Sequence, residues 1–169
     1  MSSIIRADRW QNSDGVAYNS VLQVVSTTKT DTFTSTSTSP VAITGASATI
    51  TPKFSTSKIL VSYFFTMSSS AGTETAIQIL RDSTVVGGGT VAGSRRSATS
   101  VTTIPTGHMF PHAGAFFDSP ATTSSVVYSL YGWTINGTFY IGRSSGDTDN
   151  NSAANARTSL TITVMEIAQ

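Results

Sequence analysis

The sequence predicts an all-β domain, a β-sandwich or a jelly roll, on three observations. About a third of the 169 residues bear hydroxyl groups, 27 Ser and 28 Thr, and they alternate with Val, Ile, Phe and Tyr. Thr and the β-branched and aromatic residues fit a pleated sheet, whereas Ser, Gly and Pro favour turns. Short apolar segments with a period of two recur between such turn residues, and none longer than ten residues has a helical period. This spacing is typical of sandwiches and jelly rolls.

The composition limits both the size of the domain and its partners. A chain of 169 residues corresponds to one domain with one core. Charged residues make up only 11% of the chain, so the surface must be rich in hydroxyl groups instead. The net charge of +1 predicts no nucleic-acid partner, because such proteins normally carry a basic stripe. Without cysteine there is neither a disulfide framework nor a thiolate metal site.

Membrane and targeting signals are not evident in the sequence. The longest apolar run, residues 59–65, is far shorter than a membrane span of roughly 20 residues. The first ten residues do not resemble a signal peptide. We therefore expect no membrane insertion.

Residues 1–15 are predicted to form an N-terminal arm outside the strand pattern. They include Arg6, Asp8, Arg9, Trp10 and Asp14 and show neither a period of two nor a helical period. A large aromatic anchor beside charged side chains is typical of binding hot spots. We expect these five residues to dock the protein on a partner, while residues 16–169 form the single folded domain.

The first strands are expected between residues 16 and 57. Residues 21–25 (VLQVV) are nearly all apolar, which predicts a strand buried on both faces. Residues 29–39 alternate Ser and Thr around Phe33 and are typical of either an edge strand or a solvated loop. Residues 41–44 and 48–51 predict two short strands that turn at Gly45.

The strongest strand pattern covers residues 58–67. Ile59, Val61, Tyr63 and Phe65 fall on one face, so this strand should be central. A strand at residues 75–81 with two inward isoleucines should follow, then a short one at residues 85–86. The small-residue stretch 90–106 predicts a long connection with one strand near Val101.

The last third of the chain predicts four more strands. Residues 108–117 are interrupted by proline and glycine, which favours an edge or bulged strand. Residues 126–133 alternate cleanly, and Asn136–Gly137 predicts a two-residue hairpin with a type I′ turn. Residues 142–157 should be an exposed loop. Residues 158–167 place Leu160, Ile162 and Val164 on one face.

Taken together, these segments resemble a family of virion structural or tail-fibre-like proteins from phages of marine bacteria and cyanobacteria. The resemblance rests on an ordered series rather than on one motif: residues 5–15 (IRADRWQNSDG), 21–25 (VLQVV), 51–61 (TPKFSTSKILV), 117–130 (FDSPATTSSVVYSL) and 158–168 (TSLTITVMEIA). It implies a compact jelly roll comparable to the heads of tumour necrosis factor and C1q, assembled as a homotrimer on the surface of a bacteriophage particle. It leaves open whether the particle site is the head or the tail.

The residues themselves are compatible with a trimer. The last strand carries apolar side chains on one face and Thr and Met on the other, so both faces could be covered. Unpaired strand edges and apolar faces are a liability unless charged or hidden, and this chain has few charges. Association around a three-fold axis would hide such a surface and stop further growth.

Catalytic and metal motifs are weak throughout. His108 and His112 share a strand face without an evident third ligand, and Asp118 with Ser119 is typical of a turn before Pro120. Asp147, Asp149 and Asn151 alternate like the start of a calcium loop but lack its glycine and its final glutamate. We therefore expect no enzyme activity, no cofactor and no metal, with these last three residues as the weak candidates for a structural ion.

Aromatic residues beside polar loops could contact a receptor. Tyr131, Trp133, Tyr140 and Arg143 flank the predicted hairpin and the 142–157 loop, and such residues can cover the apolar face of a sugar. The alternative is that Tyr131 or Trp133 belongs to the core or to the seam between subunits.

Two functions for a virion protein remain open at this stage. A capsid decoration (cement) protein or head fibre would bind other virion proteins, whereas a tail-fibre adhesin would attach to host surface glycan. A third possibility, of another class, is a glycan-binding or glycan-degrading domain. The carboxylates available for glycan cleavage are scattered: Asp118, Asp147, Asp149 and Glu166, the last expected at the rim or in a salt bridge.

Overall fold

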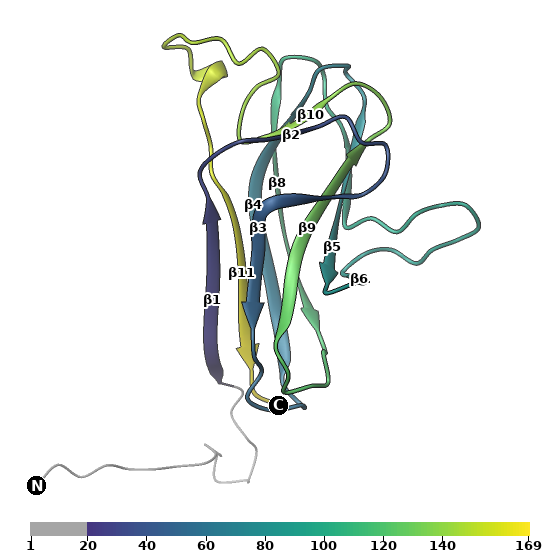
Figure 1. Ribbon diagram of the computed structural model, residues 1–169, viewed down its shortest axis with the longest axis vertical. Helices are drawn as coiled ribbons and strands as arrows, with labels where there is room; N and C mark the ends of the chain where they lie inside the picture. Colours follow the sequence, from purple (N-terminus) through teal and green to yellow (C-terminus); the bar gives the residue numbers. More distant parts are fainter. Residues whose placement is uncertain (1–19) are drawn as a thin grey trace, which may run out of the picture.

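The computed structural model describes residues 20–169, which form two antiparallel β-sheets packed face to face (Figure 1). One turn of 3-10 helix, Ala153–Asn155, lies in the loop before the last strand. The strands are β1 (Val21–Lys29), β2 (Phe33–Ser35), β3 (Val41–Ile50), β4 (Lys58–Ser69), β5 (Glu74–Arg81), β6 (Thr84–Val86), β7 (Ser100–Thr103), β8 (Met109–Asp118), β9 (Val126–Thr134), β10 (Phe139–Ile141) and β11 (Leu160–Ile167).

The strand order confirms the predicted β-sandwich and is that of a jelly roll. In the first sheet the order is β1-β11-β4-β10-β2, and β8 pairs with the other side of β4. In the second sheet the order is β3-β9-β5-β6, and β7 pairs with the same edge of β5 beyond β6. Eight strands therefore lie as β1-β11-β4-β8 against β3-β9-β5-β6, as in a jelly roll.

The core lies between the two sheets, and β4 supplies its centre as predicted. Ile59, Val61 and Phe65 are fully buried on the inner face of β4, and Tyr63 is 8% exposed. Leu160, Ile162 and Val164 of β11 face the same core, as the alternation in residues 158–167 predicted. From the second sheet, Ile77 and Ile79 point inward as predicted.

The expectation that residues 21–25 are buried on both faces is wrong. β1 is an edge strand that pairs with β11, and Val21 and Val24 are 55% and 53% exposed. Only the inward side chains, such as Val25, pack against the core. The run is apolar on both sides because its outer side chains belong to an apolar surface described below.

Residues 41–50 form one strand, where two strands over residues 41–44 and 48–51 were predicted. β3 runs from Val41 to Ile50, and its pairing with β9 shifts register between Ala42 and Ser47. Gly45 lies inside this irregular stretch with φ +80°. The glycine therefore makes a bulge in a continuous strand rather than a turn between two strands.

The predicted Asn136–Gly137 hairpin is also wrong. β9 pairs with β3 and β5 in one sheet, whereas β10 pairs with β2 and β4 in the other. Gly137 has φ +68°, and Thr138 exchanges hydrogen bonds with Ser70 at the end of β4. Asn136–Gly137 does form a turn, but the turn leads the chain from β9 in the second sheet to β10 in the first sheet instead of back along the same sheet.

The weakly patterned stretch between β6 and β7 folds back on itself. Gly89 N donates to the Ala98 carbonyl (3.3 Å) and Arg95 N to the Ala92 carbonyl (3.1 Å), which closes a hairpin over residues 87–99. In Figure 1 this 87–99 hairpin projects to the right of the second sheet. The strand expected near Val101 is β7.

Candidate functional site

The predicted docking residues Arg6, Asp8, Arg9, Trp10 and Asp14 lie outside the described residues. The described chain begins at Ser20, whose carbonyl accepts a hydrogen bond from Ala168 N (2.9 Å). The two ends of the domain thus lie together at one pole of the sandwich, which we call the base (lower end of Figure 1). The described chain therefore begins at the base.

The base is held together by a buried carboxylate that sequence reasoning placed at the rim. Glu166 follows Val164 on the inner face of β11 and is fully buried. Its carboxylate accepts hydrogen bonds from Gln23 Nε2 (2.6 Å), Lys53 N (2.7 Å) and Phe54 N (3.3 Å). It joins β1, β11 and the β3–β4 loop, and its partners are amides rather than the expected salt bridge.

The environment of Glu166 favours its charged form. Burial alone would raise its pKa, but the hydrogen bonds from Gln23, Lys53 and Phe54 outweigh burial and lower the pKa below its ordinary value. The nearby Ser57 hydroxyl adds to this effect, although it makes no hydrogen bond of normal geometry. Glu166 is therefore a structural anion that fixes the β3–β4 loop.

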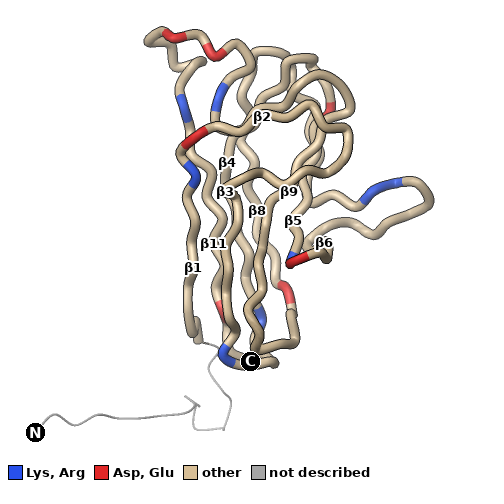
Figure 2. Tube along the Cα trace, in the orientation of Figure 1, with Lys and Arg blue, Asp and Glu red and all other residues tan. Residues whose placement is uncertain are grey.

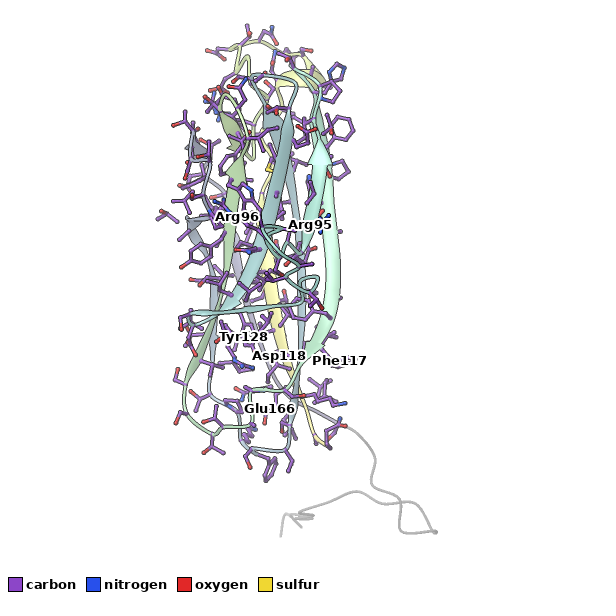
Figure 3. All side chains as sticks on the ribbon, turned by 90° about the vertical axis from the view of Figure 1, so that its right-hand side faces the viewer. Arg95, Arg96, Phe117, Asp118, Tyr128 and Glu166 are labelled. Carbon is purple, nitrogen blue, oxygen red and sulfur yellow. The ribbon has the colours of Figure 1, made fainter. Side chains whose placement is uncertain are left out.

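A second polar cluster connects the two sheets above Glu166. Asp118 ends β8, and its Oδ2 accepts from Arg81 Nη1 (2.6 Å) on β5 and from Tyr128 Oη (2.7 Å) on β9. Figure 3 shows Asp118 beside Tyr128. Burial and this hydrogen bond raise the pKa of Tyr128 far above its ordinary value, so its hydroxyl remains a donor. Asp118 is thus a bridge between sheets, not the turn residue predicted.

The outer face of β1-β11-β4-β8 carries an apolar row that sequence reasoning did not find. The register aligns Phe117 with Leu60, Leu60 with Met165, and Met165 with Val24, so these four side chains cross the whole sheet. Phe117 is 60% exposed and Val24 is 53% exposed. Phe64, four residues further along β4 than Leu60, is 50% exposed on the same face. Alternation in each strand hinted at this face, but the row exists only because four separate strands align.

This outer face carries one charged side chain within the described strands, Lys58 at the start of β4 beside the base. Beyond the apolar row it consists of small and hydroxyl-bearing residues, and Ser26 Oγ lies 2.8 Å from Thr163 Oγ1. A hollow of about 150 Å³ lies among Ser62, Tyr63, Phe64, Thr161 and Thr163. Figure 2 shows the charged segments mainly toward the ends of the sandwich and on the 87–99 hairpin. We call the part of this surface beyond Lys58, with outward residues from β1, β11, β4 and β8, the uncharged face.

The weak ion candidate Asp147 has its carboxylate engaged by two arginines. Arg143 Nη1 lies 2.8 Å from Asp147 Oδ2, and Arg157 Nη2 lies 2.7 Å from Asp147 Oδ1. These guanidinium groups would compete with and repel a cation at this carboxylate. Asp149 and Asn151 are exposed in the same loop. Within residues 20–169, no three His, Asp or Glu side chains are placed to share a metal ion.

The four predicted receptor contacts are divided between two places. Tyr140 on β10 lies under Arg143, with the guanidinium carbon 4.2 Å from the ring centroid. Tyr131 and Trp133 lie on β9 in the other sheet and point away from the core. Trp133 is 8% exposed and Tyr131 half-buried. Trp133 is therefore covered without being part of the core between the sheets.

The two histidines do not form a pair. His108 is exposed in the turn before β8, where its Nδ1 lies 3.1 Å from the Thr106 carbonyl oxygen. His112 points inward, 5% exposed, and stacks on Phe65 with ring centroids 5.2 Å apart. Burial lowers the pKa of His112, so its imidazole is neutral near pH 7. His108 and His112 therefore cannot share a metal ion, because the His108 ring lies outside the sandwich and the His112 ring lies inside it.

Comparisons with known proteins add little beyond the fold. No protein-family model and no curated protein matches the chain. Among solved structures it is similar to a chain in the structure of infectious bursal disease virus Gt strain, with 15% identity and a TM-score of 0.48. A chain in the structure of the Gx strain of that virus gives the same values. The alignments cover 96% and 98% of this chain but 44% and 42% of the viral chains.

The chain thus spans less than half the length of these viral chains, and a likeness of this degree does not say what the protein binds. Its class follows from its own strands: an all-β, jelly-roll β-sandwich. In the described part of the chain, no helix is long and apolar enough to cross a membrane.

Proposed function

We propose that the protein is a non-enzymatic structural protein on the surface of a phage virion. It assembles as a homotrimer through the uncharged face and docks on the particle through its N-terminal arm. On the capsid it acts as a decoration (cement) protein or a head fibre. The observation that carries this proposal is the uncharged face itself, because a free protein gains nothing from exposing it.

Copies of the same chain are the occupant that best fits the uncharged face. The face has a charged side chain only at its edge, Lys58, whereas its area combines protruding phenyl groups with a hollow on one surface. Phe117 and Phe64 protrude, while the hollow is lined by Ser62, Thr161 and Thr163. A surface that carries both knobs and a hollow can pack against copies of itself around a closed axis.

The position of Ser20 supports docking through the residues that precede it in the sequence. Ser20 lies at the base, where the apolar row also lies, so a trimer with its axis along the sandwich would bring three copies of Ser20 to one end. Trp10, flanked by Arg6 and Arg9, offers an aromatic anchor with charged donors. Three such anchors at one end would bind other virion proteins with the avidity of linked sites.

Copy number tests this proposal directly. Quantitative mass spectrometry of purified particles gives the ratio of this chain to the major capsid protein, and hence its copies per particle. The number of copies per particle should be a multiple of three. Hundreds of copies would support capsid decoration, and absence from particles would overturn the virion role. Deletion of residues 2–14 should abolish incorporation while leaving the trimer intact; unchanged incorporation would show that the arm is not the docking element.

A tail-fibre or receptor-binding role on host glycan is the second candidate. It is favoured by the covered but outward-facing Trp133, which lines a groove described below. Copies numbering a few tens or fewer would favour this fibre role over decoration. For glycan cleavage, the candidate acids are poorly suited, since Asp118, Asp147 and Glu166 are each held by other side chains or amides.

A further inference from the structure

A groove lies on the outer face of the second sheet, on the opposite side of the sandwich from the uncharged face. Its floor is a row across three strands: the register aligns Val101 on β7 with Ala76 on β5, and Ala76 with Trp133 on β9. The small alanine between two larger side chains leaves the hollow. Of these three, Val101 is 60% exposed and Trp133 presents only a small part of its indole.

The walls of the groove come from two loops that the chain ties together. The 87–99 hairpin contributes Ser94, Arg96 and Ala98, and the β2–β3 loop contributes Thr38. Arg96 Nη1 donates to the Thr38 carbonyl (2.8 Å), which joins the two walls. Figure 3 looks onto this side and labels Arg96 and its neighbour Arg95.

Hydrogen bonds to β5 hold the 87–99 hairpin in place as one wall of the groove. Gln78 Nε2 on the outer face of β5 donates to the Ser97 carbonyl. Thr99 N donates to the Ile77 carbonyl (2.7 Å), and Thr99 Oγ1 accepts from Ile79 N (3.1 Å). The groove is thus built into the fold.

The groove has the size and chemistry of a small-ligand site. Its volume is about 480 Å³, within the roughly 300–1,000 Å³ usual for such sites. Apolar surface from Val101, Trp133 and Ile135 combines with hydroxyl groups and with one acid and one base, Glu74 and Arg96. The two opposite charges balance, which disfavours a strongly charged ligand.

We propose that this groove binds a neutral saccharide. A sugar ring has an apolar face that suits the Val101 and Ile135 side chains and the exposed part of Trp133. Its hydroxyl groups both donate and accept, so they match a carboxylate and a guanidinium in one site. A peptide is a poorer fit, because the floor of the groove runs across β7, β5 and β9 rather than along a strand edge. The proposal assigns a ligand and a binding site to the protein. It rests on the proposed virion role in one respect: a protein on the particle surface would meet host glycan.

The two tryptophans of the chain make the test direct. Trp10 and Trp133 are the only ones, so the full-length Trp10→Phe variant reports on Trp133 alone. Neutral oligosaccharides of glucose, galactose and N-acetylglucosamine are titrated against this variant by fluorescence, and against the parent by calorimetry. One of these sugars should give a saturable change in Trp133 emission with a matching calorimetric Kd.

Three substitutions identify the groove as the source of the signal. Glu74→Gln and Arg96→Gln should each weaken binding about tenfold or more, because each removes a charged hydrogen-bond partner of the sugar. Arg95→Gln is the matched control: it removes the adjacent arginine, which does not line the groove, and should bind like the parent.

Several outcomes would overturn the saccharide proposal. They are the lack of a saturable change with every neutral sugar, binding of charged sugars or peptides alone, and undiminished binding by Glu74→Gln. These titrations use purified protein and require neither a particle nor the arm. If no sugar binds, the copy number in particles still tests the virion role. If the protein is absent from particles, a measured Kd still supports the saccharide site.

Discussion

Individual buried polar residues make this sandwich sensitive to pH. The core region contains a neutral imidazole at His112 and an ionised carboxylate at Glu166, which burial affects in opposite ways. The pKa of His112 is lowered by burial: its Nδ1 lies 3.4 Å from Ser100 Oγ, but its Nε2 has no hydrogen-bond partner. The pKa of Glu166 is lowered because amide donors more than compensate. Acid should therefore destabilise the fold through both residues, in different pH ranges.

His112 should reduce stability as the pH falls below its unfolded-state pKa of 6.5. The unfolded chain then binds a proton that the native state excludes, so the free energy of unfolding falls by at most about 1.4 kcal/mol per pH unit. Urea denaturation at several pH values from neutral to mildly acidic measures this slope. His112→Phe, which keeps a ring on Phe65, should remove the slope, whereas exposed His108→Gln should retain it. An unchanged slope in His112→Phe would assign the effect to other groups.

Glu166→Gln should lower the free energy of unfolding by about 1–3 kcal/mol at neutral pH, since the charged acceptor for Gln23, Lys53 and Phe54 is lost. Because the native pKa is depressed, the contribution of Glu166 is present above its unfolded pKa of 4.5 and is lost as the pH falls through the lower native value. The difference between parent and variant should therefore shrink in acid. A difference that is independent of pH would mean that ionisation of Glu166 is not what stabilises the base.

At the level of strands and turns, two glycines have structural roles that differ from those their local sequence predicts. Gly45 sits in a bulge inside β3, and Gly137 sits where the chain crosses from one sheet to the other. In both cases positive φ is required, as a turn prediction assumes. What the local signal lacks is the identity of the strands that follow, because pairing partners lie far away in the sequence.

Gly137→Ala should destabilise the protein more than Gly107→Ala. Both positions have positive φ, +68° and +81°, which costs a residue with a Cβ about 1–2 kcal/mol. At Gly137 the added Cβ would also lie 2.5 Å from Ala71 Cβ, whereas at Gly107 nothing lies within 4 Å. Thermal unfolding measures the loss of stability in each variant. Gly107→Ala gives the cost of the positive φ alone, and the additional loss in Gly137→Ala gives the cost of the steric clash. Equal losses would mean that the β4–β5 turn yields freely and does not define the crossing.

At the scale of the whole molecule, the two sheets present opposite kinds of outer surface. The outer face of the first sheet is uncharged beyond Lys58 and apolar toward the base, and that of the second is covered by the 87–99 hairpin and carries a groove. A trimer formed through the first would leave the second exposed on the outside. The base, with the start of the arm, would remain available for the particle.

Phe64→Lys should convert the trimer into monomers, because an ammonium group buried in an apolar interface costs several kcal/mol. Phe64 is 50% exposed at the centre of the uncharged face, so the folded subunit itself should tolerate the lysine. Sedimentation velocity measures the change, and circular dichroism checks the fold. Val91→Lys, on the 87–99 hairpin and 63% exposed, is the control and should remain trimeric. A parent that is monomeric at all concentrations would refute the proposed assembly.

The all-β class, the position of most strands and the inward faces of β4, β5 and β11 could be predicted from the amino-acid sequence. These features follow from a period of two, which is a local property of the pleated backbone. Other features could be seen only in the folded chain: β1 is an edge, residues 41–50 are one strand and Asn136–Gly137 crosses between sheets. The same is true of the buried position of Glu166, the apolar row on the uncharged face and the groove beside Trp133. Each of these depends on the register between strands distant in the sequence, which packing of the whole sandwich sets and no local pattern contains.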